Sequence, residues 1–200
     1  MVVVAVMAIV VSRTTTPANV SAAAGAPPPA ASVAEAVDVP VLSGVLAPSV
    51  AGATSWLNTN PLADAELHKQ VVLYDFWTFE CVNCFHTLPY VKAWQARYAK
   101  DGLVIVGIHS PEFSTEKDPR NVARFVMDHQ ITYPVALDPD WKVWTAWGNR
   151  YWPAFYLYDS HGLRLQHFGE GDYENTENTI RALLNVDPAS PRATVVPEPA

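Results

Sequence analysis

Two near-continuous apolar segments stand in the middle of the chain, at residues 71–77 and 103–109. Segments of this length without polar alternation are typical of central β-strands that are covered on both faces of a sheet. Between them, apolar side chains recur at spacings of three and four after Cys84, which predicts a helix that ends near Gly102. Strand, helix and strand in this order predict two parallel strands joined by a right-handed crossover.

The second half of the chain predicts shorter elements. Asp118 and Pro119 indicate a helix start, because Asp is a favoured N-cap and Pro is favoured at the first helical position. Residues 131–137 predict a short strand, and Pro134 within it indicates the edge of a sheet. Further expected elements are a helix over 140–147, a hairpin of strands 154–158 and 163–168, and a closing helix over 172–184. We therefore expect an α/β fold with a mixed central sheet and helices on both faces.

The two cysteines of the chain, Cys81 and Cys84, stand between the first long strand and its helix. This Cys-x-x-Cys position is typical of a redox dithiol, because the helix dipole and the free N–H groups favour the thiolate of the first cysteine. Two cysteines are too few for a disulfide scaffold, and a structural zinc site would need two further ligands. Half of a metal site and a pair of inert thiols are the alternatives.

Further candidate residues follow from the strand ends, where sheets of this kind place their sites. Trp77 and His109 end the two long strands, so the loop after His109, with Glu112, is expected beside the cysteines. Asp75 lies within an apolar strand, where desolvation should raise its pKa. Glu80 directly precedes the first cysteine, and its charge should disfavour the thiolate unless it points into solvent or pairs with a basic side chain.

Composition limits the class of protein and divides the chain. Half of the 200 residues are hydrophobic, and the formal net charge of −7 argues against a nucleic-acid partner, which favours a basic patch. Residues 1–12 form an apolar segment that is too short to span a bilayer and has the length of a signal or anchor segment. Residues 13–44 predict a flexible Ala/Pro-rich linker, 45–186 the folded domain, and 187–200 a flexible Pro-rich tail.

Several ordered motifs of residues 45–186 resemble the thioredoxin superfamily, and within it the extracytoplasmic domains of DipZ and TlpA type. The general motifs are Asp75-Phe-Trp77, Cys81-x-x-Cys84, Pro89 and Trp152-Pro153. Closer similarity lies in Trp56-Leu-Asn-Thr59, Leu88-Pro-Tyr-Val91, Pro111-Glu-Phe113, Asn149-Arg-Tyr-Trp-Pro153 and Gly169-Glu-Gly-Asp-Tyr173. The resemblance implies a thioredoxin-like three-layer fold. It also implies a cis Pro153 opposite the cysteines, Trp77 and Trp152 at their rim, and Asp75 as a proton shuttle.

The function implied by the resemblance is an extracytoplasmic thiol–disulfide oxidoreductase. Cys81 would attack a disulfide of a protein substrate and Cys84 would resolve the mixed disulfide, without a cofactor or a metal. The TlpA-like features favour a reductase, and so does a Glu80 charge that opposes the Cys81 thiolate. No multi-helix membrane domain like that of DipZ stands in this sequence, so a separate membrane electron donor is expected. The apolar N-terminus would allow association with a membrane.

Two alternatives share the predicted fold. A thiol peroxidase is one, because Thr78-x-x-Cys81 is part of the motif Pro-x-x-x-Thr-x-x-Cys, although Tyr74 occupies the proline position. A copper-binding metallochaperone is the other, with the two thiolates and a histidine as ligands that suit Cu(I). Relatives of the copper-binding type usually space their cysteines one residue wider.

Overall fold

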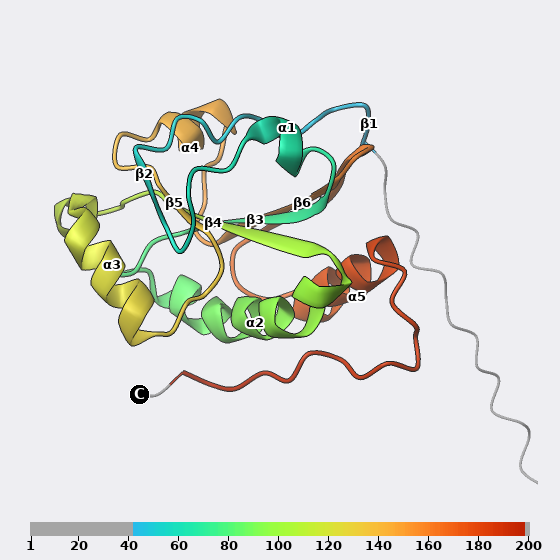
Figure 1. The fold of residues 1–200 in the computed structure, drawn as a ribbon. Coiled ribbons are helices and arrows are strands. Elements are labelled where there is room, and N and C mark those ends of the chain that lie inside the picture. Colours follow the sequence, from blue (N-terminus) through green and yellow to red (C-terminus); the bar gives the residue numbers. More distant parts are fainter. Residues whose placement is uncertain (1–41, 199–200) are drawn as a thin grey trace, which may run out of the picture. The chain divides into compact units, whose positions relative to one another are not determined.

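A mixed sheet of seven strands forms the centre of the structure, a computed structural model that describes residues 42–198 (Figure 1). The order across the sheet is β1-β7-β6-β3-β4-β5-β2. Strands β3, β4 and β5 run parallel, and the remaining pairings are antiparallel. The strands are β1 Leu42–Ser43, β2 Ser55–Leu57, β3 Val71–Trp77, β4 Leu103–His109, β5 Val135–Leu137, β6 Ala154–Asp159 and β7 Gly162–Phe168. The expectation of an α/β fold with a mixed sheet is confirmed.

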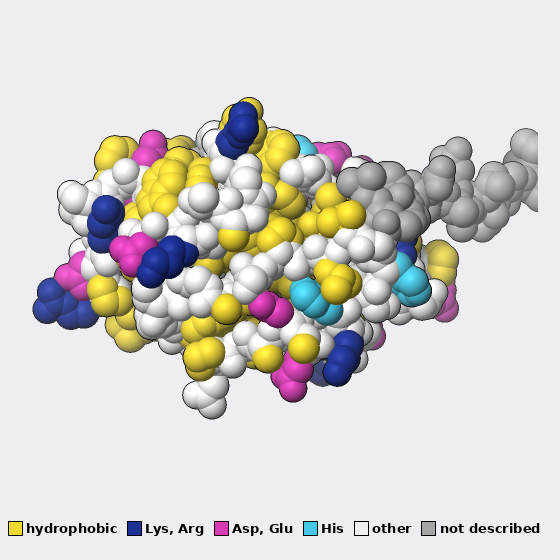
Figure 2. All heavy atoms as spheres, turned by 90° about the horizontal axis from the view of Figure 1, so that it is seen from above, with side chains coloured by type: hydrophobic (Ala, Val, Ile, Leu, Met, Phe, Trp, Pro, Cys, Tyr) yellow, Lys and Arg dark blue, Asp and Glu magenta, His cyan; other side chains and the backbone are white. Residues whose placement is uncertain are grey.

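Helices cover both faces of this sheet and complete three layers (Figure 1). One face carries α2 (Val82–Tyr98), α3 (Pro119–Asp128) and α5 (Tyr173–Leu183), and the other carries α1 (Asp64–Leu67) and α4 (Lys142–Ala146). Short 3₁₀ helices, η1 (Ala99–Asp101) and η2 (Ser114–Lys117), follow α2 and precede α3. Each helical layer packs its own apolar cluster against the sheet. Figure 2 views the α1 and α4 side, where Lys and Arg side chains are scattered singly between apolar areas.

The alternation of side chains along β3 decides which residues meet the cysteine-bearing helix. Leu73 and Trp77 point into the cluster formed with α2, whereas Tyr74 and Phe76 point into the cluster formed with α4. Asp75, between Leu73 and Trp77, therefore faces α2. Both faces of β3 are buried, as its apolar sequence predicted.

One prediction about the sheet edges is wrong. Strand β5 is not an edge strand, because β2 pairs with it antiparallel on the side away from β4. Pro134 precedes β5 and disturbs no pairing, since its carbonyl accepts a hydrogen bond of 2.9 Å from Gly107 N. Strand β1 falls within the segment that was predicted as a linker. Strands β1 and β2 were not predicted, because two and three residues are too few to show a period of two. The signal-like segment 1–12 and linker residues 13–41 lie outside the described residues.

Residues 187–198 are packed against the domain, contrary to the prediction of a flexible tail. They form neither helix nor strand: a turn closed by Ser190 N and Asp187 O (2.9 Å) is followed by a stretch that runs along α2 in extended form (Figure 1). The Arg181 guanidinium, on α5, donates to the carbonyl oxygens of Asp187 (3.0 Å), Pro188 (3.2 Å) and Ser190 (3.1 Å). Glu198 accepts from Lys92 Nζ at 2.5 Å. Proline richness excludes regular structure here, but it does not exclude binding by side chains.

Arg181→Ala is expected to lower the free energy of unfolding by about 2–4 kcal/mol, because it removes a nearly buried guanidinium that donates to three carbonyl groups of residues 187–190. Its side chain is nearly buried and also donates to Tyr98 Oη at 3.2 Å. Urea denaturation measures the change. Arg124→Ala, at an exposed position of α3, is the control and should change the stability by less than about 0.5 kcal/mol. Equal effects of both substitutions would contradict the anchoring role of Arg181.

No helix within residues 42–198 is long and apolar enough to cross a membrane.

Candidate active site

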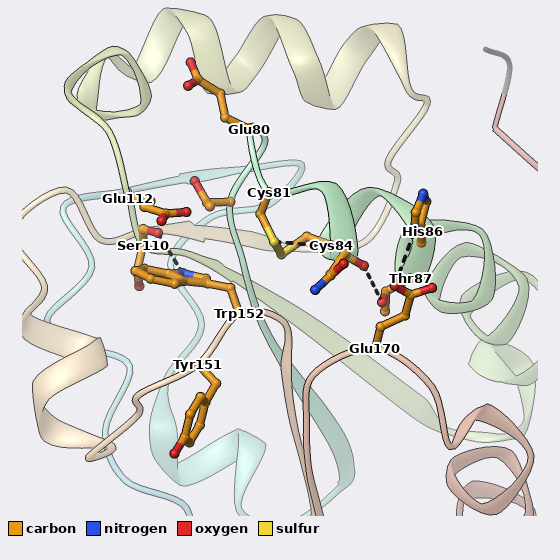
Figure 3. The surroundings of a disulfide bond; sticks show 12 residues. Glu80, Cys81, Cys84, His86, Thr87, Ser110, Glu112, Tyr151, Trp152 and Glu170 are labelled. Carbon is orange, nitrogen blue, oxygen red and sulfur yellow. Dashed lines mark hydrogen bonds and ion pairs between the residues drawn. A yellow bond between two sulfur atoms is a disulfide. The ribbon is translucent and has the colours of Figure 1, made fainter.

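Cys81 and Cys84 form a disulfide at the point where β3 passes into α2 (Figure 3). Their Cα atoms are 5.2 Å apart. Cys81 is the N-cap of α2, and its sulfur accepts a hydrogen bond of 3.2 Å from Cys84 N. Cys81 is partly exposed, whereas Cys84 is only 5% exposed. The two sulfurs therefore differ in access, and the helix N-terminus favours a thiolate on the more accessible one.

The loop before β6 brings a cis proline to the same end of the sheet. The Trp152-Pro153 peptide bond is cis, as the resemblance implied. Trp152 Nε1 donates to Ser110 O at 3.0 Å, which ties this loop to the loop after β4 (Figure 3). Trp152 remains partly exposed beside the disulfide, whereas the exposed Tyr151 lies beyond Trp152 and points away from the sulfurs (Figure 3).

Asp75 shares a small cavity with the buried cysteine. The cavity has a volume of about 10 Å³ and is lined by Asp75, Trp77, Thr78, Cys84, Phe85, Leu88 and Phe125. Burial raises the pKa of Asp75 to about 8, and its Oδ1 has no hydrogen-bond partner among the described residues. A carboxyl group with these properties is neutral at pH 7 and can exchange a proton near pH 8.

Trp77 and His109 were predicted at the rim, but both lie beneath the site. Trp77 is 4% exposed and packs edge-on against His109, with ring centroids 5.0 Å apart. His109 is 1% exposed, and burial lowers its pKa to about 4, so the ring is neutral at pH 7. Its Nε2 lies 3.3 Å from Thr78 Oγ1. Both residues end strands as expected, but the alternation of side chains turns them towards the covered face.

Exposed acidic residues surround the disulfide. Glu112 and Trp152 border it on one side, and His86 and Glu170, 3.2 Å apart, border it on the other (Figure 3). The Glu80 carboxylate accepts from Thr115 Oγ1 at 2.6 Å and points away from the sulfurs (Figure 3). That the charge of Glu80 disfavours the Cys81 thiolate stays a prediction. A carboxylate that points away from the sulfurs gives this prediction less support.

Sequence reasoning missed Glu116, which is buried behind the segment that precedes Cys81. Its carboxylate accepts hydrogen bonds from four donors in two loops of the site. The segment 110–117 was expected to be a plain loop, and no spacing or composition within it signals a buried carboxylate.

A cluster of three or more His, Cys, Asp or Glu side chains that could hold a metal ion does not occur within residues 42–198.

A disulfide at a helix N-terminus, with a cis proline beside it and a buried carboxyl beneath it, defines a thioredoxin-like redox protein. The chain belongs to the AhpC/TSA family, whose sequence profile matches residues 44–165.

Individual relatives agree with this class. The chain is 46% identical over 143 residues to protein DipZ of Mycobacterium tuberculosis, a match that covers 70% of this chain and 21% of DipZ. It is 31% identical to the thiol-disulfide oxidoreductase YkuV of Bacillus subtilis, covering 62% of this chain and 82% of YkuV. The chain thus spans about a fifth of the length of DipZ.

A solved structure supports the fold. The solution structure of a thioredoxin-like protein in its oxidised form superimposes with a TM-score of 0.63 at 27% identity. The match covers 70% of this chain and 95% of the other.

Proposed function

We propose that this chain is a thiol–disulfide oxidoreductase that acts on protein disulfides. The observation that carries the proposal is the unequal exposure of two cysteines joined at the N-terminus of α2. In the reduced protein, the Cys81 thiolate attacks a substrate disulfide, forms a mixed disulfide and releases one substrate thiolate. The Cys84 thiolate then attacks the Cys81 sulfur and releases the second substrate thiolate. Two electrons pass to the substrate, and the Cys81–Cys84 disulfide is regenerated.

Asp75 is proposed as the proton acceptor for Cys84 in the second step. Cys84 must lose its proton before it attacks, and it has almost no contact with solvent. The carboxylate of Asp75 lines the same cavity, whose volume of about 10 Å³ corresponds to one water molecule. With its pKa raised to about 8, the Asp75 carboxylate is a stronger base than an ordinary carboxylate, so it can accept a proton from a thiol at a smaller cost in free energy.

The surface around the disulfide suits an extended segment of a protein. The backbone before Pro153 is available to pair with such a segment, as in other cases of strand addition. The partly exposed Trp152 offers an apolar contact beside Cys81. This chemistry needs no cofactor other than the cysteine pair.

The proposed location is outside the cytoplasm, where disulfides persist and the apolar segment 1–12 would direct or anchor the chain. A reductase in that compartment needs a supply of electrons, so we propose a separate membrane protein as the donor. These two points rest on the sequence and on the similarity to DipZ.

The two alternatives find less support at the site. A peroxidase would need the Thr78 hydroxyl at Cys81, but this hydroxyl is buried and donates to Glu116. A copper site would need a third ligand beside the cysteines, and within residues 42–198 no such group of three is assembled.

Equilibration with reduced and oxidised glutathione tests the proposed function. We expect full and reversible exchange of the Cys81–Cys84 pair and a potential below about −200 mV, on the side of the reducing members of this class. Tryptophan fluorescence or thiol labelling followed by mass spectrometry reports the redox state. A pair that does not exchange, or a reduced protein that fails to reduce an insulin disulfide, would refute the proposal. A potential near −120 mV would instead identify an oxidant.

A further inference from the structure

Glu116 joins the two loops that border the disulfide. One of its carboxylate oxygens accepts hydrogen bonds from Thr78 Oγ1 and from Glu80 N, the latter at 2.8 Å. The other oxygen accepts from Glu112 N and Phe113 N, both at 2.7 Å. The residue is 1% exposed, so these four donors replace the water that an ionised carboxylate would otherwise bind.

These hydrogen bonds keep Glu116 ionised. They lower its pKa, although burial alone would raise it. The carboxylate is therefore a fixed negative charge at neutral pH, placed where solvent screens it less than at the surface. Thr78 donates its proton to Glu116, so the nearby His109 Nε2 must carry a proton and donate to Thr78. His109, Thr78 and Glu116 thus form one chain of hydrogen bonds under the site.

The two loops held by Glu116 control the position of Cys81. Residues Thr78 to Glu80 lead directly into Cys81, and the N–H of Glu80 is fixed by the carboxylate. The other loop is itself anchored, because Ser110 Oγ donates to Asp138 at 3.0 Å and Ser110 O accepts from Trp152. Glu116 therefore links the segment before the nucleophile to the loop after β4, and Ser110 of that loop contacts Trp152 beside the cis proline.

We propose that Glu116 is a positioning residue that stabilises the disulfide over the dithiol. By fixing the segment before Cys81, it keeps the two sulfurs at bonding distance and raises their effective concentration. Its negative charge disfavours a thiolate at Cys81. Both effects favour the oxidised protein and make the reduced protein a stronger reductant. The inference rests on the proposed function, since it concerns the redox equilibrium of the same cysteines.

Glu116→Gln tests the proposal in the glutathione equilibrium. The substitution removes the charge and turns an amide NH₂ towards N–H or O–H donors. We expect the equilibrium constant for reduction by glutathione to rise about three-fold or more, given a charge effect weakened by solvent. Glu116→Asp keeps the charge but is too short to reach both loops, and it should shift the equilibrium in the same direction. This variant also serves if Glu116→Gln fails to fold.

Glu177→Gln is the matched control, because Glu177 is also a buried carboxylate with several donors. It accepts from Tyr98 Oη, from Ala193 N at 2.8 Å and from Arg192 Nε at 3.1 Å, all distant in the fold from the cysteines. Its loss should reduce stability and leave the glutathione equilibrium unchanged. The inference on Glu116 is overturned if both Glu116 variants destabilise the oxidised and reduced forms equally and keep the wild-type equilibrium constant. A wild-type protein that does not exchange with glutathione would instead refute the proposed function.

Discussion

Cys84→Ser is expected to accumulate mixed disulfides with substrate proteins, whereas Cys81→Ser is expected to form none. Cys81 is the partly exposed N-cap of α2, so its sulfur can reach a substrate disulfide. Cys84 is 5% exposed and reaches only the sulfur of Cys81. Without Cys84 the first step still occurs, but the mixed disulfide has no internal thiol to release it. Both variants should lose essentially all turnover, for different reasons.

Thiol labelling measures the same asymmetry in the reduced wild-type protein. A brief pulse of iodoacetamide at pH 7 should modify Cys81 about ten times faster than Cys84, because access and helix position both favour the first thiol. Peptide mass spectrometry quantifies each site, and labelling in denaturant gives the reference in which both thiols react alike. Mixed disulfides trapped by Cys81→Ser would reverse the roles assigned to the two cysteines. Equal labelling rates in the folded protein would show that the two thiols do not differ in reactivity.

The long elements around the disulfide could be predicted from the sequence because their signals are local. Buried strands show as apolar runs, and α3 begins at an Asp118 cap that accepts from Arg120 N at 2.9 Å. Strand β2 and helix α1 have three and four residues, too few to show a period. Their stability comes from pairing and packing with distant segments, which a local pattern does not contain.

The candidate site divides in the same way. The two cysteines, Asp75 and Pro153 stand in motifs, so sequence and resemblance together located them. The Glu116 carboxylate accepts a hydrogen bond from Glu80 N, 36 residues away in sequence, and only the folded chain brings the two residues together. Trp77 was wrongly predicted at the rim. The alternation of side chains could have prevented this error, since Trp77 lies two residues after Asp75 and faces the same covered side of the sheet.

Asp75→Asn is expected to stabilise the oxidised protein at pH 8 and to have little effect near pH 4. The pKa of Asp75 is about 8 in the folded protein against 3.8 as the reference value. Between these values the folded state binds the proton that the unfolded state has lost. The stability of the wild type must therefore fall as pH rises from about 4 to 8. Asn carries no charge, so the variant avoids this loss.

The difference in unfolding free energy between variant and wild type should grow to about 2–5 kcal/mol at pH 8. Urea denaturation of the oxidised proteins at several pH values measures it. Asp138→Asn is the contrasting control, because the buried Asp138 accepts from Val143 N (3.0 Å), Trp144 N (2.8 Å) and Ser110 Oγ. Its replacement turns one of the two acceptor oxygens into an NH₂ donor that faces other donors, and it should destabilise the protein. A constant difference between Asp75→Asn and wild type from pH 4 to 8 would show that Asp75 is ionised throughout.

The same substitution should slow the second step of the reaction, in which Cys84 attacks the mixed disulfide. Asn cannot accept the thiol proton, so resolution should fall by about a hundredfold near pH 8. The preceding attack by Cys81 should change far less, because Cys81 is in contact with solvent. Stopped-flow mixing of reduced protein with a disulfide peptide separates the two steps. If the variant is more stable but resolves mixed disulfides as fast as wild type, the charge of Asp75 destabilises the protein and Asp75 takes no part in proton transfer. Stabilisation together with slow resolution would mean that this carboxyl lowers stability because the reaction needs a buried base.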